Sequence, residues 1–213
     1  MIKIFYIALA AVACALVGPA AAQTFPLKPV TFLVPFAPGG GTDAFARPLA
    51  AQLETQLKTR ILIENRAGAG GTTGASVAAK AAAGGHTFLV GAAHHAIAPA
   101  LYPRLDYDLE KDFHPVGMIA MPPQVLVTNP DKVAAKTLRE FIDFAQKNPG
   151  RINYASAGNG TTHHLAGELF KLLTKTNLTH VPYSGAGPAM ADLLAGHVDA
   201  EFDGLGDRKS TRL

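Results

Sequence analysis

Cysteine is almost absent from the chain, and Cys14 is the only one among 213 residues. It lies in an apolar run over residues 4–17 that follows Lys3 and precedes the small residues at 20–22. This order is typical of a cleaved secretory signal, and the run is too short to span a membrane. We therefore predict a signal peptide over residues 1–22. The exported chain would then hold no cysteine, which excludes disulfides, thiolate catalysis and cysteine-bound metals.

Charge is also scarce, since Asp, Glu, Lys and Arg make up 16% of the residues. The formal net charge of +3 comes entirely from Lys3 (+1) and from residues 207–213 (+2), so the rest of the chain is neutral overall. A neutral chain lacks the basic surface that binds nucleic acid or anionic membranes. The apolar content of 48% and the lack of polar low-complexity segments argue against disorder. They predict one large or two small packed domains.

Nucleotide and metal motifs are missing as well. No Gly-Lys-Ser or Gly-Lys-Thr occurs, which excludes a P-loop. The glycine-rich segment 68–74 has its third glycine one position late for a dinucleotide fingerprint, and no acidic residue follows the next strand to bind a ribose. The adjacent histidines at 94–95 and 163–164 would diverge on a helix or a strand, and His164 with Glu168 supplies only two ligands. We therefore expect no cofactor and no metal.

Strand-like and helix-like segments alternate through short loops, which predicts parallel sheets joined by right-handed crossovers. After Asp43, apolar residues recur every four positions on one predicted helix face; they are Phe45, Leu49, Leu53 and Leu57. Another helix is expected at about 72–83, and Thr137 and Glu140 form a capping box for a third. The strands are expected at 30–36, 61–64, 87–90, 116–120, 124–128, 152–156, 178–183 and 198–203.

The crossing between two domains is expected at Met121-Pro122-Pro123, between two of these short strands. The segment before it, residues 102–115, is irregular and rich in Pro, Tyr and Asp. We therefore predict a first α/β lobe over residues 23–122 and a second over residues 123–206.

Three loops with the same chemistry connect a predicted strand to a predicted helix: 37–43, 157–162 and 184–187. Their small residues let the backbone approach a ligand closely, and helix N-termini offer unpaired N–H groups at the positive end of the dipole. Such loops predict a site for a small anion. None of them contains Lys or Arg, which favours a carboxylate over a polyphosphate.

The polar residues in and near these loops each have two interpretations. Asp43 is either the helix N-cap or a partner for a ligand ammonium or for Gly40 and Gly41. Four others are either caps or ligand donors: Thr42, Asn159, Thr161 and Thr162. A second hypothesis for the whole chain is an exported α/β hydrolase, in which Ser156 pairs with His163 or His164. Ser156 lies at a strand end but lacks the glycine pattern of a nucleophile elbow.

Four segments resemble the Bug-type solute-binding proteins of tripartite tricarboxylate transporters: Pro35–Asp43, Glu64–Gly71, Asn153–Gly160 and His180–Tyr183. The similarity extends from about Phe25 to Phe202 in the expected order. It implies a two-lobed, type II-like periplasmic α/β binding protein that closes on a small carboxylate without catalysing a reaction. It also implies a monomer in the periplasm that presents its ligand to the membrane subunits of a tripartite transporter.

The ligand-binding residues that the resemblance implies are Gly40, Gly41, Thr42, Asp43, His95, Ala157, Gly158, Asn159, Thr161, Thr162, Tyr183, Ser184 and Asp203. The chain departs from the family at Ala98, where the family usually has Asn, and at Gly204, which follows Asp203 in place of Asn. Dicarboxylates, tricarboxylates, acidic amino acids and aromatic acids all remain open as ligands.

Family members continue well beyond residue 206, so the resemblance implies a chain truncated at its C-terminus. Residues 207–213 resemble translated sequencing-adapter sequence, and we predict that they are a non-native tail. An incomplete second lobe would leave unpaired strand edges and apolar faces exposed. We therefore expect the chain as written to be unstable or prone to aggregate.

Overall fold

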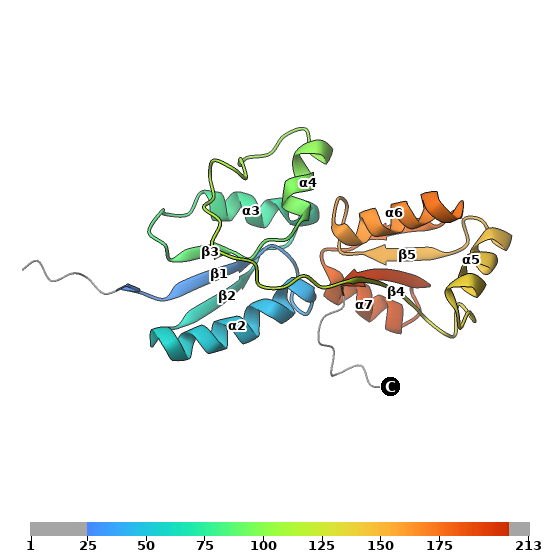
Figure 1. The fold of residues 1–213 in the computed structure, drawn as a ribbon, viewed down its shortest axis with the longest axis horizontal. Helices are drawn as coiled ribbons and strands as arrows, with labels where there is room; N and C mark the ends of the chain where they lie inside the picture. The colour runs from blue at the N-terminus through green and yellow to red at the C-terminus, as the bar shows by residue number, and fades with distance from the viewer. Residues whose placement is uncertain (1–24, 205–213) are drawn as a thin grey trace, which may run out of the picture.

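The computed structural model describes residues 25–204. The predicted signal peptide at 1–22 and the predicted tail at 207–213 therefore lie outside the described residues. Two α/β lobes lie side by side, and an extended segment passes from one to the other (Figure 1). Within residues 25–204, no helix combines the length and the apolar character needed to cross a membrane.

The first lobe is built on a parallel three-stranded sheet in the order β2-β1-β3. Its elements are β1 (Val30–Val34), α2 (Gly41–Leu57), β2 (Ile61–Asn65), the 3-10 turn η1 (Ala69–Gly71), α3 (Thr72–Ala79), β3 (Thr87–Leu89) and α4 (His94–Leu101). Alternate side chains of β1 pack against Ala46 and Ala50 of α2, whose small size lets the helix lie close to the sheet. The buried face of α2 is therefore shifted from the predicted one: Leu49 and Leu53 are partly buried and Leu57 is exposed.

Two segments at the exit from the first lobe differ from the sequence-based expectation. Helix α4 has no counterpart among the predicted helices. The predicted strand at 116–120 is wrong, since this segment is irregular and pairs with no strand among residues 25–204. Its side chains are not packed against a sheet, since Val116 is 80% and Met118 is 76% exposed.

The second lobe contains a four-stranded sheet in the order β4-β7-β5-β6, in which β4 is antiparallel to β7 and the other pairs are parallel. Its elements are β4 (Gln124–Thr128), α5 (Leu138–Lys147), β5 (Asn153–Ser156), α6 (Thr162–Thr174), β6 (Thr179–Pro182), α7 (Ala186–Leu194) and β7 (Ala200–Gly204). The predicted N-cap is confirmed, because Thr137 Oγ1 accepts from Glu140 N at 3.2 Å. The second bond of the capping box differs from the expectation, since Glu140 Oε2 accepts from Lys136 N at 2.7 Å and not from Thr137 N.

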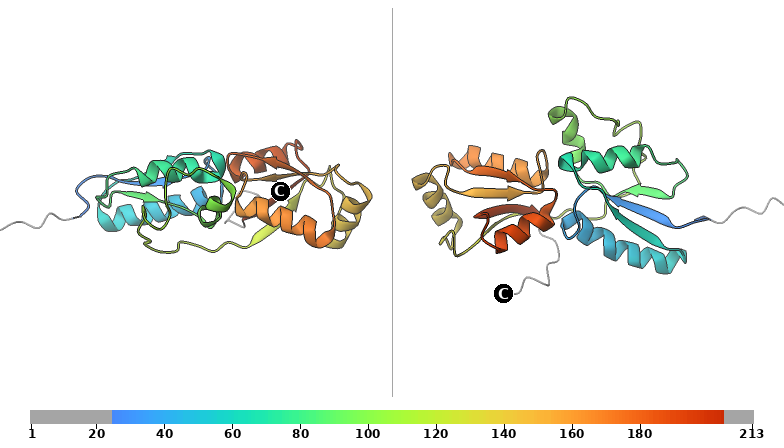
Figure 2. Two further views of the ribbon diagram at one scale, coloured as in Figure 1. Left: turned by 90° about the horizontal axis from the view of Figure 1, so that it is seen from above. Right: turned by 180° about the vertical axis from the view of Figure 1, so that it is seen from behind.

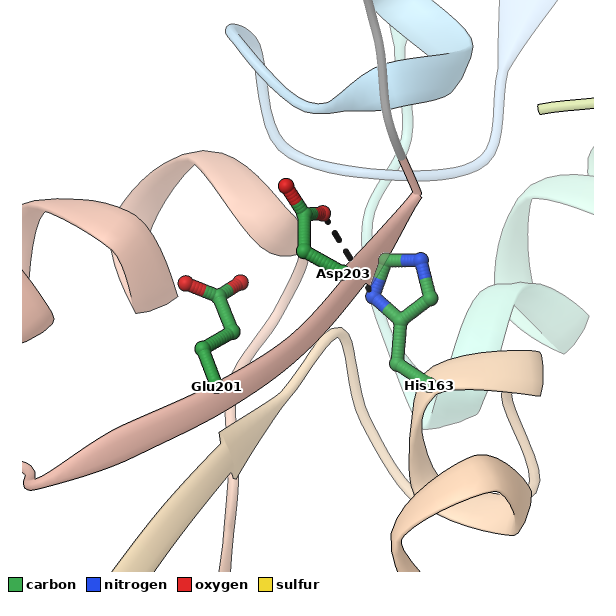
Figure 3. Close-up of side chains that lie close together, drawn as sticks. All are labelled: His163, Glu201 and Asp203. Atoms are coloured by element: carbon green, nitrogen blue, oxygen red, sulfur yellow. Dashed lines mark ion pairs between the residues drawn. The ribbon is translucent and has the colours of Figure 1, made fainter. Parts of the chain in front are cut away.

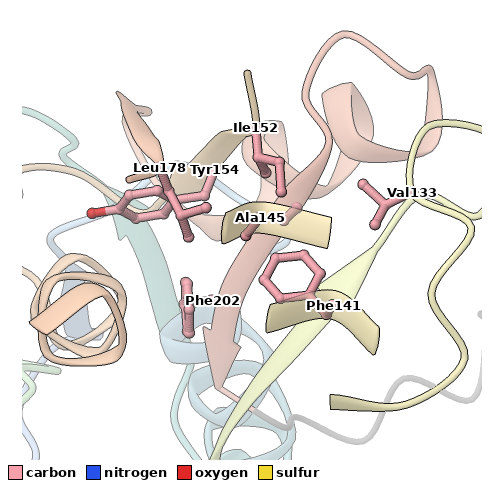
Figure 4. Close-up of a cluster of buried hydrophobic side chains, with 8 residues drawn as sticks. Val133, Phe141, Ala145, Ile152, Tyr154, Leu178 and Phe202 are labelled. Atoms are coloured by element: carbon pink, nitrogen blue, oxygen red, sulfur yellow. The ribbon is translucent and has the colours of Figure 1, made fainter. Parts of the chain in front are cut away.

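Side-chain alternation along the strands gives the second lobe two packed layers. Tyr154 and Phe202 face α5 and α6, in a cluster that includes Phe141 (Figure 4). Ala155, the next residue along β5, faces α7 on the other side of the sheet. Both faces of the sheet are therefore covered by helices, and the parallel strands β5, β6 and β7 end at the edge that faces the first lobe (Figure 1).

Candidate functional site

The two lobes meet through the loops that lead into α2 and α7 (Figure 2). Ala37 N of the first lobe donates to Ser184 O of the second at 3.1 Å. A Cβ added to Gly40 would lie 3.4 Å from the backbone nitrogens of Ala186 and Gly187. The first turns of α2 and α7, one from each lobe, are therefore in contact.

These two helix N-termini share a feature that bears on ligand binding. Gly40 caps α2 and Gly185 caps α7, and neither helix has a side-chain hydrogen bond to its cap. The first N–H groups of a helix have no partner within the helix, and they carry partial positive charge. Two positive helix ends placed together, with no cationic side chain in either loop, are suited to one small anion.

A second contact between the lobes involves η1 and the loop that leads into α6. Tyr102 OH donates to Asn159 O at 3.0 Å. A Cβ on Gly70 would collide with the same carbonyl, and Gly70 has a φ of +61°. Gly158 faces Gly70 and has a φ of +128°. Glycine is required at both positions, because the backbones approach closely in a conformation that L side chains rarely adopt.

Asp43 lies inside the first turn of α2 and is not its N-cap, which corrects one of the two interpretations of this residue. Its carboxylate accepts hydrogen bonds from Gly39 N at 3.0 Å, from Asn65 Nδ2 at 3.0 Å, and from Arg47 Nε and Nη2 at 2.7 and 2.9 Å. Burial raises the pKa of Asp43, but the hydrogen bonds from Arg47, Gly39 and Asn65 outweigh it and hold the pKa below its ordinary value. These contacts make Asp43 a residue that fixes the loop carrying Gly40 and Gly41.

Thr161 is the N-cap of α6, where Thr162 begins the helix. Its Oγ1 donates to Gly158 O at 2.7 Å and accepts from His164 N at 3.4 Å. Thr161 is 2% exposed, whereas Asn159 in the same loop is exposed. Thr161 therefore holds the shape of the loop, and Asn159 offers its side chain to the surroundings.

The structure does not support the Ser–His pairs of the hydrolase hypothesis. The Ser156 hydroxyl lies 2.6 Å from His180 Nε2, so its imidazole partner is His180 and not the predicted His163 or His164. Ser156 is 0% exposed, so its oxygen cannot reach a substrate. The hydroxyl also accepts from Gly158 N at 3.1 Å. Ser156 therefore helps to fix the conformation of the loop at Gly158 through this hydrogen bond.

Three other predicted residues, Ala157, Tyr183 and Ser184, also lie where the two lobes face each other. Tyr183 OH donates to Asp192 Oδ2 at 2.7 Å, so its hydroxyl turns back along α7. Burial and then Asp192 raise the pKa of Tyr183 to about 12. Ser184 is exposed and contributes its backbone carbonyl to Ala37, and Ala157 is buried at the end of β5.

Two buried histidines begin α4 at the edge of the first lobe. His95, a predicted site residue, has Nδ1 within 3.2 Å of Ala92 N. His94, which the sequence analysis did not single out, lies 4.8 Å from the ring of Phe36 and 3.9 Å from that of His95. Burial, and then repulsion by His95 and His163, lowers the pKa of His94 to about 3. His94 is therefore neutral in the folded chain at neutral pH.

This depressed pKa predicts a pH dependence of folding. The unfolded chain takes up a proton on His94 at its ordinary pKa of 6.5, and the folded chain does so only at about 3. Stability contributed by the neutral ring is therefore lost as pH falls through this window. We expect His94→Asn to flatten the dependence of unfolding free energy on pH there by up to about 1.4 kcal/mol per pH unit. Urea unfolding at a series of pH values tests this, with exposed His197→Asn as the control; equal slopes for wild type and His94→Asn would contradict it.

The profile of the tripartite tricarboxylate transporter family receptor matches residues 45–205. The chain belongs to this family. Protein BugT of Bordetella pertussis is 40% identical over 190 residues, which are 88% of this chain and 58% of BugT. The resemblance predicted from the four sequence segments is thereby confirmed.

Solved structures of this receptor family share the fold. The periplasmic binding protein BugD superposes with a TM-score of 0.81 at 36% identity, over 84% of this chain and 60% of BugD. R. palustris Rpa4515, solved with adipate, has a TM-score of 0.82 at 37% identity, over 85% of this chain and 61% of Rpa4515. The predicted α/β binding-protein fold is confirmed, and the chain spans less than two thirds of the length of these relatives.

Proposed function

We propose that this chain carries the carboxylate-binding site of a periplasmic receptor. The receptor captures a small carboxylate between its lobes and presents it, unchanged, to the membrane subunits of a tripartite transporter. It works as a monomer, without catalysis and without nucleic acid. The observation that carries this proposal is the contact between the uncapped N-termini of α2 and α7, one from each lobe.

The site residues divide into two groups in this proposal. The first offers backbone N–H or side-chain groups to the ligand: Gly40, Gly41, Thr42, His95, Ala157, Gly158, Asn159, Thr162 and Ser184. The predicted residue Asp203 instead lies in a buried cluster with His163 and Glu201. The second group, Asp43, Thr161 and Tyr183, holds the loops in place through the hydrogen bonds described above. An anion held this way needs no lysine or arginine, because helix N-termini supply the favourable electrostatic potential.

The relatives support a carboxylate as the ligand class. Rpa4515 was solved with adipate, and it shares the fold over 85% of this chain. A linear dicarboxylate such as adipate or succinate is therefore the first class to test.

A melting-shift screen tests the proposal. We expect adipate or succinate to raise the melting temperature of the full chain, because a ligand at a hundred times its Kd adds about 2.7 kcal/mol to stability. The matched neutral ligands are adipamide and succinamide, which keep the carbon chain and remove both charges. An equal shift with the diamides, or no shift with any mono-, di- or tricarboxylate, would contradict the proposal.

A further inference from the structure

Three metal-binding side chains come together in the second lobe: His163, Glu201 and Asp203 (Figure 3). Each offers one ligand atom, and these atoms all lie within 4.8 Å of one another. His163 Nδ1 is 3.9 Å from Asp203 Oδ1. Glu201 is 0% exposed and Asp203 is 2% exposed, so both carboxylates are withdrawn from water.

The fold places these residues without any special loop. Glu201 and Asp203 alternate with Phe202 along β7, which puts both carboxylates on one face of the strand. Strand β7 lies inside the sheet, between β4 and β5. His163 is the second residue of α6, and it reaches the end of β7 from the opposite layer. Two rigid elements therefore hold the three side chains.

The cluster lies beside the interface between the lobes. His163 follows the loop at 157–161, in which Asn159 O accepts a hydrogen bond from Tyr102 of the first lobe. His163 Nε2 also lies 3.7 Å from the position that a Cβ on Gly204 would occupy. A group bound by the cluster would therefore sit close to the surface that the first lobe covers.

We propose that His163, Glu201 and Asp203 form a binding site for a divalent metal ion such as Zn2+ or Mn2+. Two carboxylates and one imidazole nitrogen are ligands that such ions accept. The ion would tie α6 to β7, and water would complete its coordination.

This site replaces the expectation from the sequence that the chain holds no metal. That expectation rested on neighbouring histidines along the chain, whereas these ligands come from positions 163, 201 and 203. The proposal goes beyond carboxylate capture, because it concerns a cation bound within the second lobe.

The test is a titration of the full chain with ZnCl2, and separately with MnCl2, by isothermal calorimetry. The protein is purified without a histidine tag and treated with EDTA beforehand. We expect one equivalent of one of these ions to bind. Glu201→Gln keeps the size of the side chain and removes its charge, and we expect it to weaken binding by about tenfold or more. Exposed His197→Gln, also in the second lobe, is the control and should bind as the wild type does.

Three results would overturn the proposal. The first is no saturable uptake of either ion by the wild type. The second is uptake that Glu201→Gln and His163→Gln leave unchanged. The third is a melting shift with L-aspartate in EDTA that exceeds the succinate shift and disappears in Glu201→Gln, because the cluster would then hold a ligand ammonium. If Glu201→Gln does not fold by circular dichroism, the wild type is titrated with Co2+, and the absence of visible d–d absorption overturns the site.

Discussion

Replacing Gly187 with alanine is expected to weaken carboxylate binding by about tenfold, or about 1.4 kcal/mol. Gly187 lies in the first turn of α7, and an added Cβ would collide with Pro38 O and lie 3.3 Å from Gly40 N of the other lobe. The methyl group would hold apart the two helix ends that we propose to share the anion. Calorimetric titration with the carboxylate that gives the largest melting shift measures the effect.

The control is Gly84→Ala, in the turn before β3 and outside the proposed site. A Cβ on Gly84 would make only an ordinary contact, 3.6 Å from His86 Nδ1. We expect its affinity to remain within about twofold of wild type, since the change touches no residue of the proposed site. Equal losses in both variants would mean that the contact between α2 and α7 does not control binding.

Replacing Gly167 with alanine is expected to destabilise the second lobe by about 2 kcal/mol. Gly167 lies in the middle of α6, where alanine alone would add about 1 kcal/mol of helix stability. Its Cβ would instead collide with the ring of Tyr154 and approach its hydroxyl to 2.9 Å. Overpacking of this kind costs about 1–3 kcal/mol and occasionally more, and we expect the upper end because the ring cannot move aside.

Tyr154 cannot move because it is held on several sides. Its hydroxyl donates to Glu168 Oε1 at 2.7 Å. Its ring stacks on His180 at 5.0 Å between centroids and meets Phe202 edge-on at 5.5 Å. A double-mutant cycle with Tyr154→Leu isolates the collision, and urea unfolding measures it. If Gly167→Ala costs as much in the Tyr154→Leu background as in the wild type, the ring is not the cause.

Short-range signals in the sequence predicted much of the fold. The strand at 30–34 and the helix after it follow from apolar periodicity and from the glycine-rich loop between them. Thr137 and Glu140 predicted the start of α5 to the residue, because the N-cap and its hydrogen-bond partner are close in the sequence. The glycine-rich loops where the two lobes meet were also predictable, because their signals are local in the sequence.

Pairings between distant residues were not predictable in the same way. Ser156 meets His180 because β5 and β6 are parallel neighbours, with Tyr154 opposite His180 and Ser156 opposite Pro182. Nothing local to Ser156 indicates this register. The proposed metal site had a weak signal in the sequence, since Glu201 and Asp203 alternate with Phe202 along one strand. Burying charge on one face of a strand costs free energy, so such a pattern indicates a special role.

The position of β7 in its sheet has a kinetic consequence. Strand β7 is the last strand of the described chain, yet it lies between β4 and β5, and Thr128 of β4 pairs with Ala200. During folding, the first lobe can form its parallel sheet from segments that lie close together in the sequence. In the second lobe, β4 stays unpaired on this side until β7, which is distant in the sequence, joins it. Contacts so far apart in sequence slow folding and expose strand edges to other chains, so we expect the second lobe to fold more slowly than the first and to be more prone to aggregate while it folds.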